Sequence, residues 1–455
     1  MIHLTPEVIA QITGGEYVGD ECARGVRVMG AVRDNREVAP GNLFVCIRGA
    51  RVDGHSFANN AFESGAACCL AERDIPDAKG PYVLVDSTLE AIKILGAGYR
   101  SSFDIPVIGI TGSVGKTTAK EMVAAVLSER FHVLKTPENL NNELGVPLTL
   151  LLLDERHEAA VIEMGISAFG EMSRLANMVR PDIVVMTKIG FAHLETLGDL
   201  GGVLKAKSEV FSYMKPEGLA VMNGDDELLR AYDPGMMKVT FGLGEFNDFR
   251  AENVRMESSE AVLFDIVSDT WRFPVKIPAY GSHLAPAALA ASAVGWRLGM
   301  TDEEIGRGFS SYVPVGDRAK VTGTGFVTLI DDCYNANPNS VRTALTSLSA
   351  LPGRRVAILG DMLELGRQSE QLHRETGAFA AQAGIDSLLC CGDKAAFIYE
   401  GYNSAGGSAA QYYAAKAELI ADLPKLIKKS DAVLVKASHS MQFEEIVSYF
   451  TGAGM

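Results

Sequence analysis

The sequence predicts an α/β protein of three domains. We expect a small α/β domain over residues 1–102, a central parallel-sheet domain with a phosphate loop over 103–313, and a Rossmann-like domain over 314–455. Three observations lead to this prediction. The 455 residues are too many for a single hydrophobic core. A glycine-rich loop stands between a strand pattern and a helix pattern. Two stretches then alternate strand patterns with helix patterns, as parallel sheets require.

The first region, up to about residue 100, contains short apolar segments separated by turn residues. Pro40-Gly41-Asn42 precedes the apolar run Leu43–Ile47, which is the pattern of a turn followed by a strand. The segment Ser101–Pro106 is more polar and ends in proline. It therefore predicts a linker to the second region.

The second region contains continuous apolar or β-branched runs, which are typical of strands covered on both faces. These runs are Val107–Ile110, Ala159–Glu163 and Ile183–Thr187, and a helix pattern follows the first at Ala119–Leu127. Residues 238–278 alternate more strongly, which predicts antiparallel strands. The alanine-rich stretch Pro278–Leu298 predicts a helix despite Pro286.

The third region begins near Tyr312–Gly316, where proline and glycine interrupt the pattern. Strands are predicted at Val327–Asp331, Arg355–Leu359, Ser387–Cys391 and Ala432–Val435, with helices between them. This repeated alternation predicts a smaller Rossmann-like domain.

Composition excludes several classes of protein. The net charge of −15 provides no broad field to attract nucleic acid or an anionic membrane. The N-terminus lacks the features of a signal peptide, and no uncharged apolar run reaches the length of a membrane span. The seven cysteines include the adjacent pairs Cys68-Cys69 and Cys390-Cys391 within apolar runs. We expect buried, reduced thiols and a cytoplasmic location.

The loop after the first strand of the second region has the composition of a nucleoside-triphosphate site. Gly112 and Gly115 allow a tight turn that directs several backbone N–H groups toward one point, and Lys116 adds a positive charge. The hydroxyl of Thr117 can ligate Mg²⁺, and the following helix presents its N-terminus to a phosphate. Five residues rather than the usual four separate Gly109 from Gly115, so the match rests on residues 111–117.

Ligands of open α/β sheets lie beyond the carboxyl ends of the strands, and this rule selects candidate residues. Glu163 ends a strand and can hold Mg²⁺ beside Thr117, although a role in capping the next turn is the alternative. His193 follows another strand, but a lone histidine is more often structural. Lys205 and Lys207 lie in a predicted helix and would by pattern alone be solvated.

The third region repeats the design of a strand followed by acids. Asp331-Asp332-Cys-Tyr-Asn-Ala-Asn-Pro338 follows its first strand, and Leu359-Gly-Asp361-Met-Leu-Glu364 follows the next. Acids and asparagines in such loops suit contacts with hydroxyls or a cation, and they also suit plain helix capping. Two such loops in one small sheet favour a shared cleft.

Across nearly its whole length the chain resembles the Mur ligases, ATP-dependent amide-forming enzymes of peptidoglycan precursor synthesis. The segments that carry the resemblance are Asp34-Asn-Arg36, Pro40-Gly-Asn-Leu-Phe44, Asp53-Gly-His55, Thr111–Thr118, Asn139–Thr149, Asp332–Pro338 and Ile358–Gly366. The segments at 139–149, 332–338 and 358–366 are similar to the branch that adds D-alanyl-D-alanine to a UDP-N-acetylmuramoyl-tripeptide. The resemblance implies a first domain that binds the UDP substrate, a central ATPase domain and a C-terminal ligase domain.

The resemblance also implies roles for particular residues. Catalytic roles fall to Lys116, His193, Lys207 and Arg318, with Arg318 reaching the γ-phosphate. ATP is expected to contact Thr111, Gly112, Ser113, Val114, Gly115, Lys116, Thr117, Thr118, Asp332 and Asn335. Two Mg²⁺ ions are implied, with ligands among Thr117, Glu163, His193 and Lys207, the last carbamylated by CO₂; Lys205 is the alternative. Substrate contacts are expected at Asn35, Arg36, Asp53, His55, Asn141, Asn142, Asp361, Lys436 and Ser438.

Several positions depart from the family pattern. Asn35 stands where the family usually has serine, and Lys188 stands where it has asparagine. Leu284 and Ala287 replace two asparagines near Gly281-Ser-His283, which removes some expected ATP contacts. His439 replaces an arginine, so this position lacks the permanent bidentate grip of a guanidinium group.

The resulting hypothesis is amide synthesis through an acyl phosphate by a protein that we expect to be monomeric. Two alternatives stay open at this stage. One is another ligase of the family, adding a single amino acid or adding glutamates to folate. The other is a nucleotide-binding paralogue without catalytic activity, because phosphate-loop binding can outlast chemistry.

Overall fold

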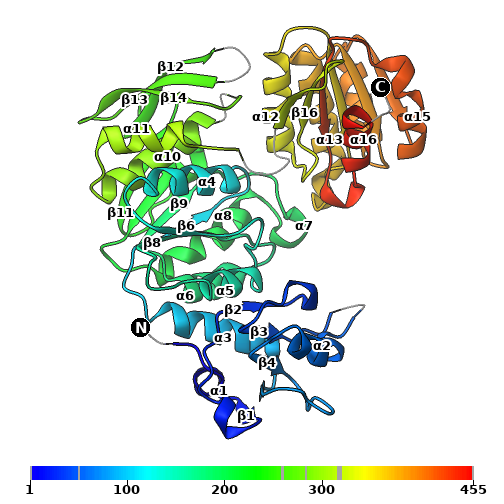
Figure 1. Ribbon diagram of the computed structural model, residues 1–455. Helices are drawn as coiled ribbons and strands as arrows, with labels where there is room; N and C mark the ends of the chain where they lie inside the picture. The colour runs from blue at the N-terminus through cyan, green and yellow to red at the C-terminus, as the bar shows by residue number, and fades with distance from the viewer. Residues whose placement is uncertain (1–2, 50–51, 258–260, 282–283, 315–319, 453–455) are drawn as a thin grey trace.

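The strands of this computed structural model form three separate sheets. The structure describes residues 3–49, 52–257, 261–281, 284–314 and 320–452. Among these residues the sheets contain five, nine and six strands, and each comes from a different region of the chain. Figure 1 shows the N-terminal sheet at one end of the molecule, the central sheet in the middle, and the C-terminal sheet beside the central one. The predicted fold class is confirmed.

The N-terminal sheet has the strand order β1-β5-β4-β3-β2. Its elements are α1 (Pro6–Thr13), β1 (Glu16–Val18), β2 (Gly30–Val32), β3 (Asn42–Val45), α2 (Ala58–Glu63), β4 (Cys68–Ala71), β5 (Tyr82–Leu84) and α3 (Thr88–Arg100). Strands β2 to β5 run parallel, and β1 is antiparallel to β5. Helix α3 joins this region to the next, and the hydroxyl of Tyr99 donates to the carbonyl of Leu153 at 2.8 Å.

Burial of the cysteines follows the prediction at six of seven positions. Cys68 and Cys69 are neighbours on β4 and are buried in different hydrophobic clusters, because successive side chains of a strand point to opposite faces. Cys390 and Cys391 divide in the same way. Cys22 is exposed, which corrects the expectation that all the thiols are buried.

The central sheet has the order β14-β13-β12-β11-β10-β9-β6-β8-β7. Its strands are β6 (Val107–Thr111), β7 (Val133–Lys135), β8 (Ala159–Glu163), β9 (Ile183–Met186), β10 (Leu219–Asn223), β11 (Met237–Gly242), β12 (Phe249–Glu257), β13 (Ala261–Val267) and β14 (Arg272–Ile277). Its helices are α4 (Lys116–Leu127), α5 (Gly145–Leu150), α6 (Glu171–Val179), α7 (Leu194–Leu197), α8 (Leu200–Ser208), α9 (Glu227–Ala231), α10 (Leu284–Arg297) and α11 (Asp302–Ser310). The strand predictions at 107, 159 and 183 are confirmed to within one residue.

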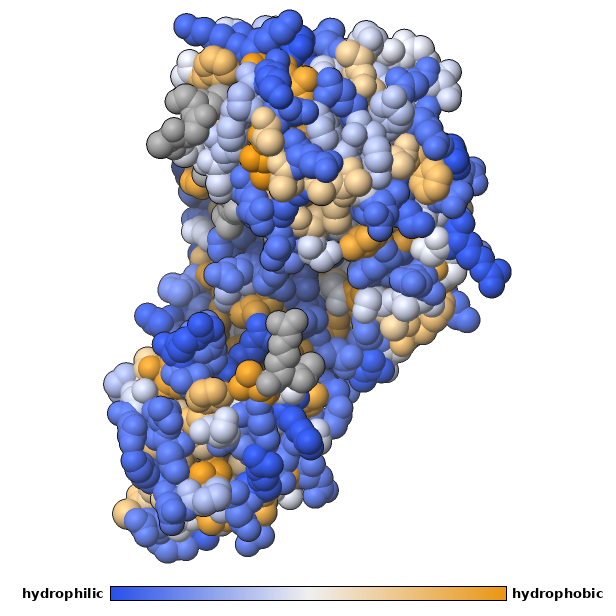
Figure 2. Space-filling model, turned by 90° about the vertical axis from the view of Figure 1, so that its right-hand side faces the viewer, coloured by the Kyte–Doolittle hydropathy of each residue, from blue (hydrophilic) through white to orange (hydrophobic). Residues whose placement is uncertain are grey.

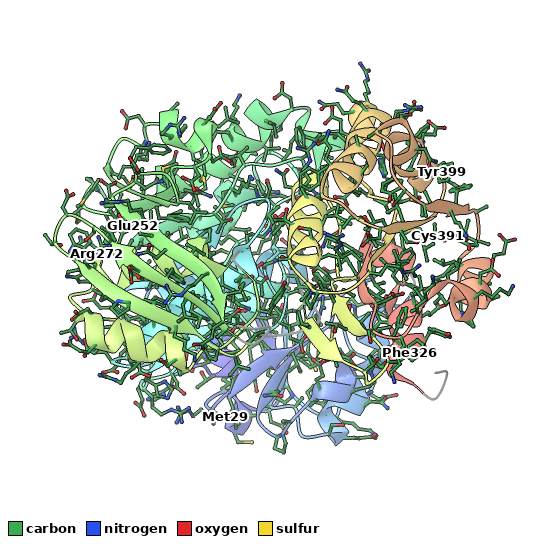
Figure 3. All side chains as sticks on the ribbon, turned by 90° about the horizontal axis from the view of Figure 1, so that it is seen from above. Met29, Glu252, Arg272, Phe326, Cys391 and Tyr399 are labelled. Carbon is green, nitrogen blue, oxygen red and sulfur yellow. The ribbon has the colours of Figure 1, made fainter. Side chains whose placement is uncertain are left out.

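Two predictions for the central region need correction. Strand β11, at the start of the predicted antiparallel stretch, runs parallel to β10 and β12, and antiparallel pairing begins only at β12–β13. Helix α10 begins at Leu284 rather than at residue 278. Pro286 then lies in the first turn, where a proline removes no helical hydrogen bond. Seen from above in Figure 3, Glu252 and Arg272 lie on the antiparallel strands, 2.8 Å apart as an ion pair.

The C-terminal sheet has the order β15-β16-β20-β17-β18-β19. Its elements are β15 (Lys320–Gly323), β16 (Thr328–Asp331), α12 (Pro338–Ser349), β17 (Arg355–Gly360), α13 (Ser369–Gln382), β18 (Ser387–Cys391), α14 (Ala395–Ser404), β19 (Ala410–Tyr413), α15 (Lys416–Leu426), β20 (Ala432–Lys436) and α16 (Glu444–Thr451). Apart from β15, which is antiparallel to β16, these strands run parallel. The four predicted strands are confirmed, each with ends within one residue.

The sheet topology determines where ligands can bind. Strand β6 lies between β8 and β9. The connection that follows β6 therefore leads to one side of the sheet, toward β7 and β8, and the later connection to β9 crosses to the other side. Strand β20 lies in the same way between β16 and β17. The two carboxyl edges contact each other, because the backbone N–H of Glu195 donates to the carbonyl of Glu364 at 3.3 Å. Figure 2 shows a hollow with largely hydrophilic walls between the upper and lower parts of this face. Such junctions are where open α/β sheets bind ligands.

Within the described residues, every helix is too short or too polar to cross a membrane.

The contact between α13 and α14 predicts a strong response to one added methyl group. A Cβ atom at Gly377 would lie 1.9 Å from the carbonyl oxygen of Ile398, whereas one at Gly306 on α11 would meet no atom within 4 Å. We expect Gly377→Ala to destabilise its domain by about 3 kcal/mol, because α14 must move. Gly306→Ala should stabilise α11 by up to about 1 kcal/mol.

Hydrogen exchange measured on peptides from α13–α14 and from α11 separates these two effects in a protein of several domains. Exchange of α13–α14 at the wild-type rate in Gly377→Ala would contradict the close packing described here.

Candidate active site between the central and C-terminal sheets

The phosphate loop takes its shape from two glycines. Gly112 has φ +144°, and a Cβ atom there would lie 2.0 Å from the hydroxyl oxygen of Thr187. Gly115 has φ +84° and precedes α4, which begins at Lys116, three residues before the predicted helix. At Gly112 only glycine allows this close approach to Thr187. Because α4 begins directly after Gly115, the loop ends at a helix N-terminus, where backbone N–H groups attract a phosphate.

Neighbouring side chains hold the loop in this shape. The Lys116 ammonium donates to the carbonyl of Gly112 at 3.0 Å. The hydroxyl of Thr187 donates to the carbonyl of Val114 at 2.6 Å, and the backbone N–H of Gly190 donates to the hydroxyl of Ser113 at 3.0 Å. The segment after β9 thus forms one wall of the loop. Thr111 is buried and its hydroxyl donates to the carbonyl of Met164, which makes its side chain part of the scaffold.

Glu163 lies beside the loop, as expected for a metal-binding acid. Its side chain is fully buried at the end of β8. The Thr117 hydroxyl donates to Oε2 at 2.9 Å, and the Asn141 amide donates to Oε1 at 2.8 Å. A buried carboxylate next to a threonine hydroxyl at a phosphate loop is a set of oxygen donors that suits Mg²⁺. The alternative, a carboxylate that only caps the next turn, does not account for these partners.

The structure distinguishes the two lysines of α8. Lys207 is 1% exposed, whereas Lys205 is exposed and its ammonium lies 5.9 Å from the centre of the Phe169 ring. Burial lowers the pKa of the Lys207 amine well below its ordinary value, and the charge of Lys116 lowers it further. Burial near Lys116 therefore favours the neutral form of the Lys207 amine.

His193 stands at the start of α7 with a backbone φ of +55°. Its Nδ1 atom lies 2.6 Å from Oε2 of Glu364, which comes from the C-terminal domain. Burial lowers the pKa of His193; Glu364 opposes this shift, and Lys207 and Lys116 add to it. His193, Lys116, Lys207 and Glu364 are therefore close enough at the domain junction for their charges to affect one another.

The predicted nucleotide-binding residues of the C-terminal domain surround one buried ammonium group. Lys436 is 2% exposed and donates to the carboxylate of Asp332 at 2.5 Å and to the carbonyl of Asn335 at 2.9 Å. The Asn335 side chain is exposed at the same loop and accepts from the backbone N–H of Ala336. The loop after β16 is thereby fastened to the end of β20, with the Asp332 carboxylate at the edge of the sheet.

Asp361 and Ser438 serve the scaffold in this structure. The Asp361 carboxylate accepts from the backbone N–H groups of Lys394 and Ala395, at 2.9 and 2.7 Å, at the start of α14. Burial raises its pKa, and these two donors oppose the rise. The Ser438 hydroxyl accepts from the backbone N–H of Leu363 at 2.9 Å. Helix capping, the plainer sequence interpretation, thus applies to Asp361.

Two segments of the N-terminal domain are held by local charge pairs. The Arg36 guanidinium grips Asp34 through its Nε and Nη2 atoms and lowers the pKa of that carboxyl to about 2. Asn35 begins the same 3₁₀ turn. The ring of His55 is buried between Asp53, 2.6 Å from Nδ1, and the backbone N–H of Glu72, which donates to Nε2. Both ring nitrogens of His55 are therefore engaged within the domain.

The predicted asparagine segment reaches two partners. Asn141 contacts Glu163, while the side-chain oxygen of Asn142 accepts from the backbone N–H of Gly145 at 2.8 Å. The Asn139 amide donates to the hydroxyl of Tyr334 in the C-terminal domain at 2.7 Å. This segment thus links the acid beside the phosphate loop to the opposite domain.

The remaining predicted positions divide into three groups. Arg318 and His283 lie outside the described residues. Leu284 and Ala287 are buried in the hydrophobic core under α10, so their side chains pack rather than bind nucleotide. His439 is largely exposed, and its ring lies 5.6 Å from that of Tyr334.

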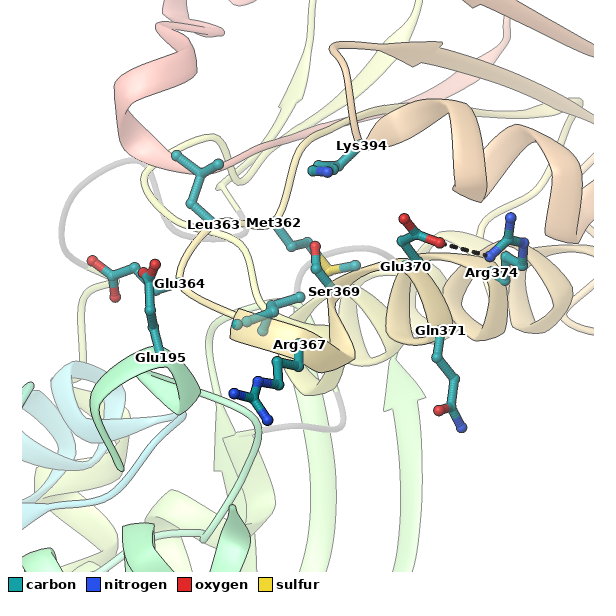
Figure 4. A pocket seen from close by; sticks show the side chains of 12 residues that line it. Glu195, Met362, Leu363, Glu364, Arg367, Ser369, Glu370, Gln371, Arg374 and Lys394 are labelled. Atoms are coloured by element: carbon teal, nitrogen blue, oxygen red, sulfur yellow. Dashed lines mark ion pairs between the residues drawn. The ribbon is translucent and has the colours of Figure 1, made fainter. Parts of the chain in front are cut away.

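An open pocket of about 840 Å³ adjoins this junction. Figure 4 shows its lining, with Glu195 from α7 beside Glu364, while Glu370 and Arg374 lie on α13 and Lys394 directly precedes α14. Sequence reasoning named Glu364 only among the acids that follow a strand and gave it no partner, although the residue stands in the segment 358–366 that carries the resemblance. It also missed Thr187, Tyr334 and Lys120, a wholly buried lysine whose ammonium donates to the carbonyl of Thr136 at 2.8 Å.

Comparison with known proteins agrees with this geometry. Family models match the chain over each sheet: the Mur ligase family catalytic domain at 30–100, the Mur ligase middle domain at 110–295 and the Mur ligase glutamate ligase domain at 317–439. The UDP-N-acetylmuramoyl-tripeptide–D-alanyl-D-alanine ligase of Bacillus subtilis is 36% identical over 98% of both chains. The chain belongs to the Mur ligase family. The predicted resemblance is confirmed.

Solved structures of this family extend the comparison to three dimensions. Crystal structure I of MurF from Acinetobacter baumannii matches with a TM-score of 0.90, at 29% identity, over 99% of both chains. MurF ligase from Thermotoga maritima in complex with ADP matches with a TM-score of 0.82, at 29% identity, over 93% of this chain and 97% of that one. The overall arrangement of the three sheets is thus that of a Mur ligase.

The buried amine of Lys207 predicts a pH-dependent contribution to stability. Its pKa is lower in the folded chain than in the unfolded chain, so the unfolded chain binds more protons between these two values. The free energy of unfolding of the wild type, relative to Lys207→Met, should therefore rise with pH up to the unfolded pKa near about 10.4. The slope can reach about 1.4 kcal/mol per pH unit.

Denaturant titrations at pH 7, 8 and 9, in buffer free of metal and CO₂, measure this difference. Lys205→Met serves as the control and should differ from the wild type by a constant amount, because that lysine is exposed. A pH-independent difference for Lys207→Met would show that the Lys207 amine is solvated.

Proposed function

We propose that this protein is an ATP-dependent ligase that joins D-alanyl-D-alanine to the peptide of UDP-N-acetylmuramoyl-tripeptide in peptidoglycan precursor synthesis. The observation that carries this proposal is a phosphate loop and a buried acid at the carboxyl edge of the central sheet, facing loops of a second sheet. Full-length similarity to ligases of that name, at 36% identity for the Bacillus subtilis protein, supports the substrates. The ADP complex of a structurally similar ligase supports ATP as the phosphoryl donor.

The reaction we infer has two steps. The terminal carboxylate of the tripeptide attacks the γ-phosphorus of ATP, which forms an acyl phosphate and releases ADP. The amine of D-alanyl-D-alanine then attacks the acyl carbon, an amide bond forms, and inorganic phosphate leaves. Lys116 and Arg318 offset the negative charge that develops during phosphoryl transfer. No side chain acts as the nucleophile, so the protein contributes orientation and exclusion of water between its domains.

We assign the phosphate groups of ATP to the loop 111–118 and its ribose to Asp332, with Asn335 nearby. The predicted substrate residues of the N-terminal domain, Asn35, Arg36, Asp53 and His55, are proposed to form the uridine-nucleotide side of the cleft. Asn141, Asn142, Asp361, Lys436 and Ser438 complete the substrate assignment. For the last three, the contacts described above favour a role in shaping the cleft.

The residues around Glu163 fit Mg²⁺. The fit rests on the buried Glu163 carboxylate beside the hydroxyl of Thr117, which together offer oxygen donors. Thr117 and Glu163 would hold one ion, and His193 with Lys207 would help to hold a second. Bound there, Mg²⁺ would neutralise phosphate charge.

We further propose that Lys207 is carbamylated. Its neutral amine nitrogen would bond to the carbon of CO₂ and release a proton to solvent, which converts the side chain to an anion able to bind Mg²⁺. The complete burial of Lys207 and the exposure of Lys205 support Lys207 as the modified residue.

The alternatives weigh less. A ligase for a single amino acid or for folate would share the fold, but the full-length relative at 36% identity carries the dipeptide ligase name. A paralogue without catalysis would not need an acid as deeply buried as Glu163 next to the phosphate loop. We place the domain boundaries at 102/103 and 313/314, and we propose a monomer that works in the cytoplasm.

The first test measures phosphate release with ATP, UDP-N-acetylmuramoyl-tripeptide and D-alanyl-D-alanine. We expect release to need all three, and Lys116→Ala to slow it about 10²–10³-fold, because a charged donor to the transferred phosphate is lost. Lys215→Ala is the control, since that exposed lysine pairs with Asp182 at the amino-terminal edge of the sheet. Release that ignores omission of the dipeptide would exclude the ligase proposal.

The second test detects the carbamate directly. Wild-type enzyme and Lys205→Ala in ¹³C-labelled bicarbonate should show a carbamate carbon signal by NMR, and Lys207→Ala should lack it. A signal that persists in Lys207→Ala and disappears in Lys205→Ala would show that Lys205 is the modified residue and would contradict our proposal.

A further inference from the structure

The segment after β17 is fixed residue by residue to its own domain. Asp361 accepts the two backbone N–H groups at the start of α14. The backbone N–H of Met362 donates to Nε2 of His373 at 3.0 Å, and that of Leu363 donates to the hydroxyl of Ser438. His373 is fully buried, and its Nδ1 lies 2.6 Å from the carbonyl of Ser369. Three consecutive residues are therefore each held by hydrogen bonds within the C-terminal domain.

Glu364, the next residue, is directed out of this framework into the domain junction. Its φ of +62° is unfavourable for a residue with a side chain, and such strain persists where the surroundings impose it. Its carbonyl accepts from the backbone N–H of Glu195 in α7. At Gly366, φ +55°, a Cβ atom would lie 3.3 Å from Cα of Glu195. The segment thus docks against α7 through its backbone.

The Glu364 side chain meets His193, which stands two residues before that docking point. Oε2 of Glu364 lies 2.6 Å from Nδ1 of His193, and the histidine also has a positive φ, +55°. The side chain of His193 is 31% exposed and that of Glu364 is 57% exposed. Two strained backbones from different domains therefore bring one carboxylate to one ring nitrogen.

We infer that Glu364 is a positioning residue: its carboxylate accepts a hydrogen bond from Nδ1–H of His193, which sets the ring orientation and leaves Nε2 as the nitrogen that would bind the metal. This inference rests on the proposed function, in which His193 helps to hold Mg²⁺. Metal-binding histidines commonly donate their second N–H to a carboxylate, which fixes tautomer and ring orientation. Here that carboxylate belongs to the opposite domain, so docking of the C-terminal domain completes the support of the metal site.

A simple surface ion pair is the competing explanation, and it would contribute little. It does not account for the positive φ at both residues or for the hydrogen bonds of residues 361–364 that aim Glu364. The fixed backbone of the residues before Glu364 aims its carboxylate at Nδ1 of His193, which fits a positioning role.

The experiment compares Glu364→Ala and Glu364→Gln in the full-length protein. Free Mn²⁺ is measured by electron paramagnetic resonance at saturating nonhydrolysable ATP analogue, and His193→Ala identifies the binding that depends on His193. Glu364→Ala should weaken that binding about 10–100-fold. Glu364→Gln should retain most of it, because the amide oxygen still accepts the N–H. Glu370→Gln, an exposed acid lining the same pocket, is the control and should match the wild type.

A second readout needs neither metal nor catalysis. In metal-free protein with ¹⁵N-labelled histidine, His193→Asn assigns one of the eight histidine ring patterns. That pattern should be the Nδ1–H tautomer in the wild type and should shift toward Nε2–H in Glu364→Ala. If the tautomer shifts but Mn²⁺ affinity does not, the inference is wrong while the ligase proposal stands.

Two further results would also overturn the inference. An unchanged tautomer in Glu364→Ala would exclude the hydrogen bond. Equal losses of Mn²⁺ affinity in Glu364→Gln and Glu364→Ala would make Glu364 a metal ligand rather than a positioning residue. Failure of the ligase proposal itself would appear separately, as wild-type enzyme that releases no phosphate with all three substrates.

Discussion

The buried carboxylate of Glu163 is the constraint on which the rest of the site depends. A charged group without solvent is costly unless donors or cations surround it. Here the carboxylate is held by Thr117 at the start of α4 and by Asn141 from the segment after β7. The strand order explains the meeting, because β6 and β8 are neighbours and their carboxyl ends open at the same edge. The phosphate loop and its acid are therefore consequences of one parallel pairing.

The segment that supplies Asn141 is itself held by Lys120 of α4 and by Tyr334 of the C-terminal domain. Lys120 on α4 is buried and donates to the carbonyls of Thr136 and Glu138. Glu138 has φ +44°, a conformation that these bonds help to maintain. Asn139, the next residue, reaches Tyr334 in the C-terminal domain. A continuous set of contacts thus runs from the helix that receives the phosphates to the domain that faces them. Movement of the C-terminal domain would act first on the Asn139–Tyr334 hydrogen bond of this set.

The sequence predicted those features that depend on local pattern. Strands buried on both faces, such as Ala159–Glu163, leave an uninterrupted apolar run, and the phosphate loop leaves its glycines and lysine at fixed spacing. Short edge strands such as β7 leave too few residues for periodicity to register. The parallel pairing of β11 was missed because the alternation within a strand is the same whichever way its partner runs, so the pattern does not reveal strand direction.

Within the site, too, sequence reasoning found the residues that a local pattern marks and missed those that only packing brings together. Glu163 and Lys116 adjoin a recognisable motif, so their chemistry could be predicted. Lys207 could not be separated from Lys205 by pattern alone, because only the packing of α8 buries one and exposes the other. Glu364 and His193 lie 171 residues apart, and nothing local marks either as the partner of the other. Contacts between domains leave no periodic signal, and they required coordinates.

Division of the site between two rigid sheets has a consequence for the chemistry. An acyl phosphate is easily lost to water, so its formation is useful only when the amine is already near and water is excluded. If the supports of the metal site come from both domains, as the Glu364–His193 contact indicates, then a molecule with separated domains lacks a fully oriented site. Phosphoryl transfer is thereby favoured in the docked arrangement, in which the cleft also brings the two substrates together. Geometry of this kind links the first chemical step to the protection of its product.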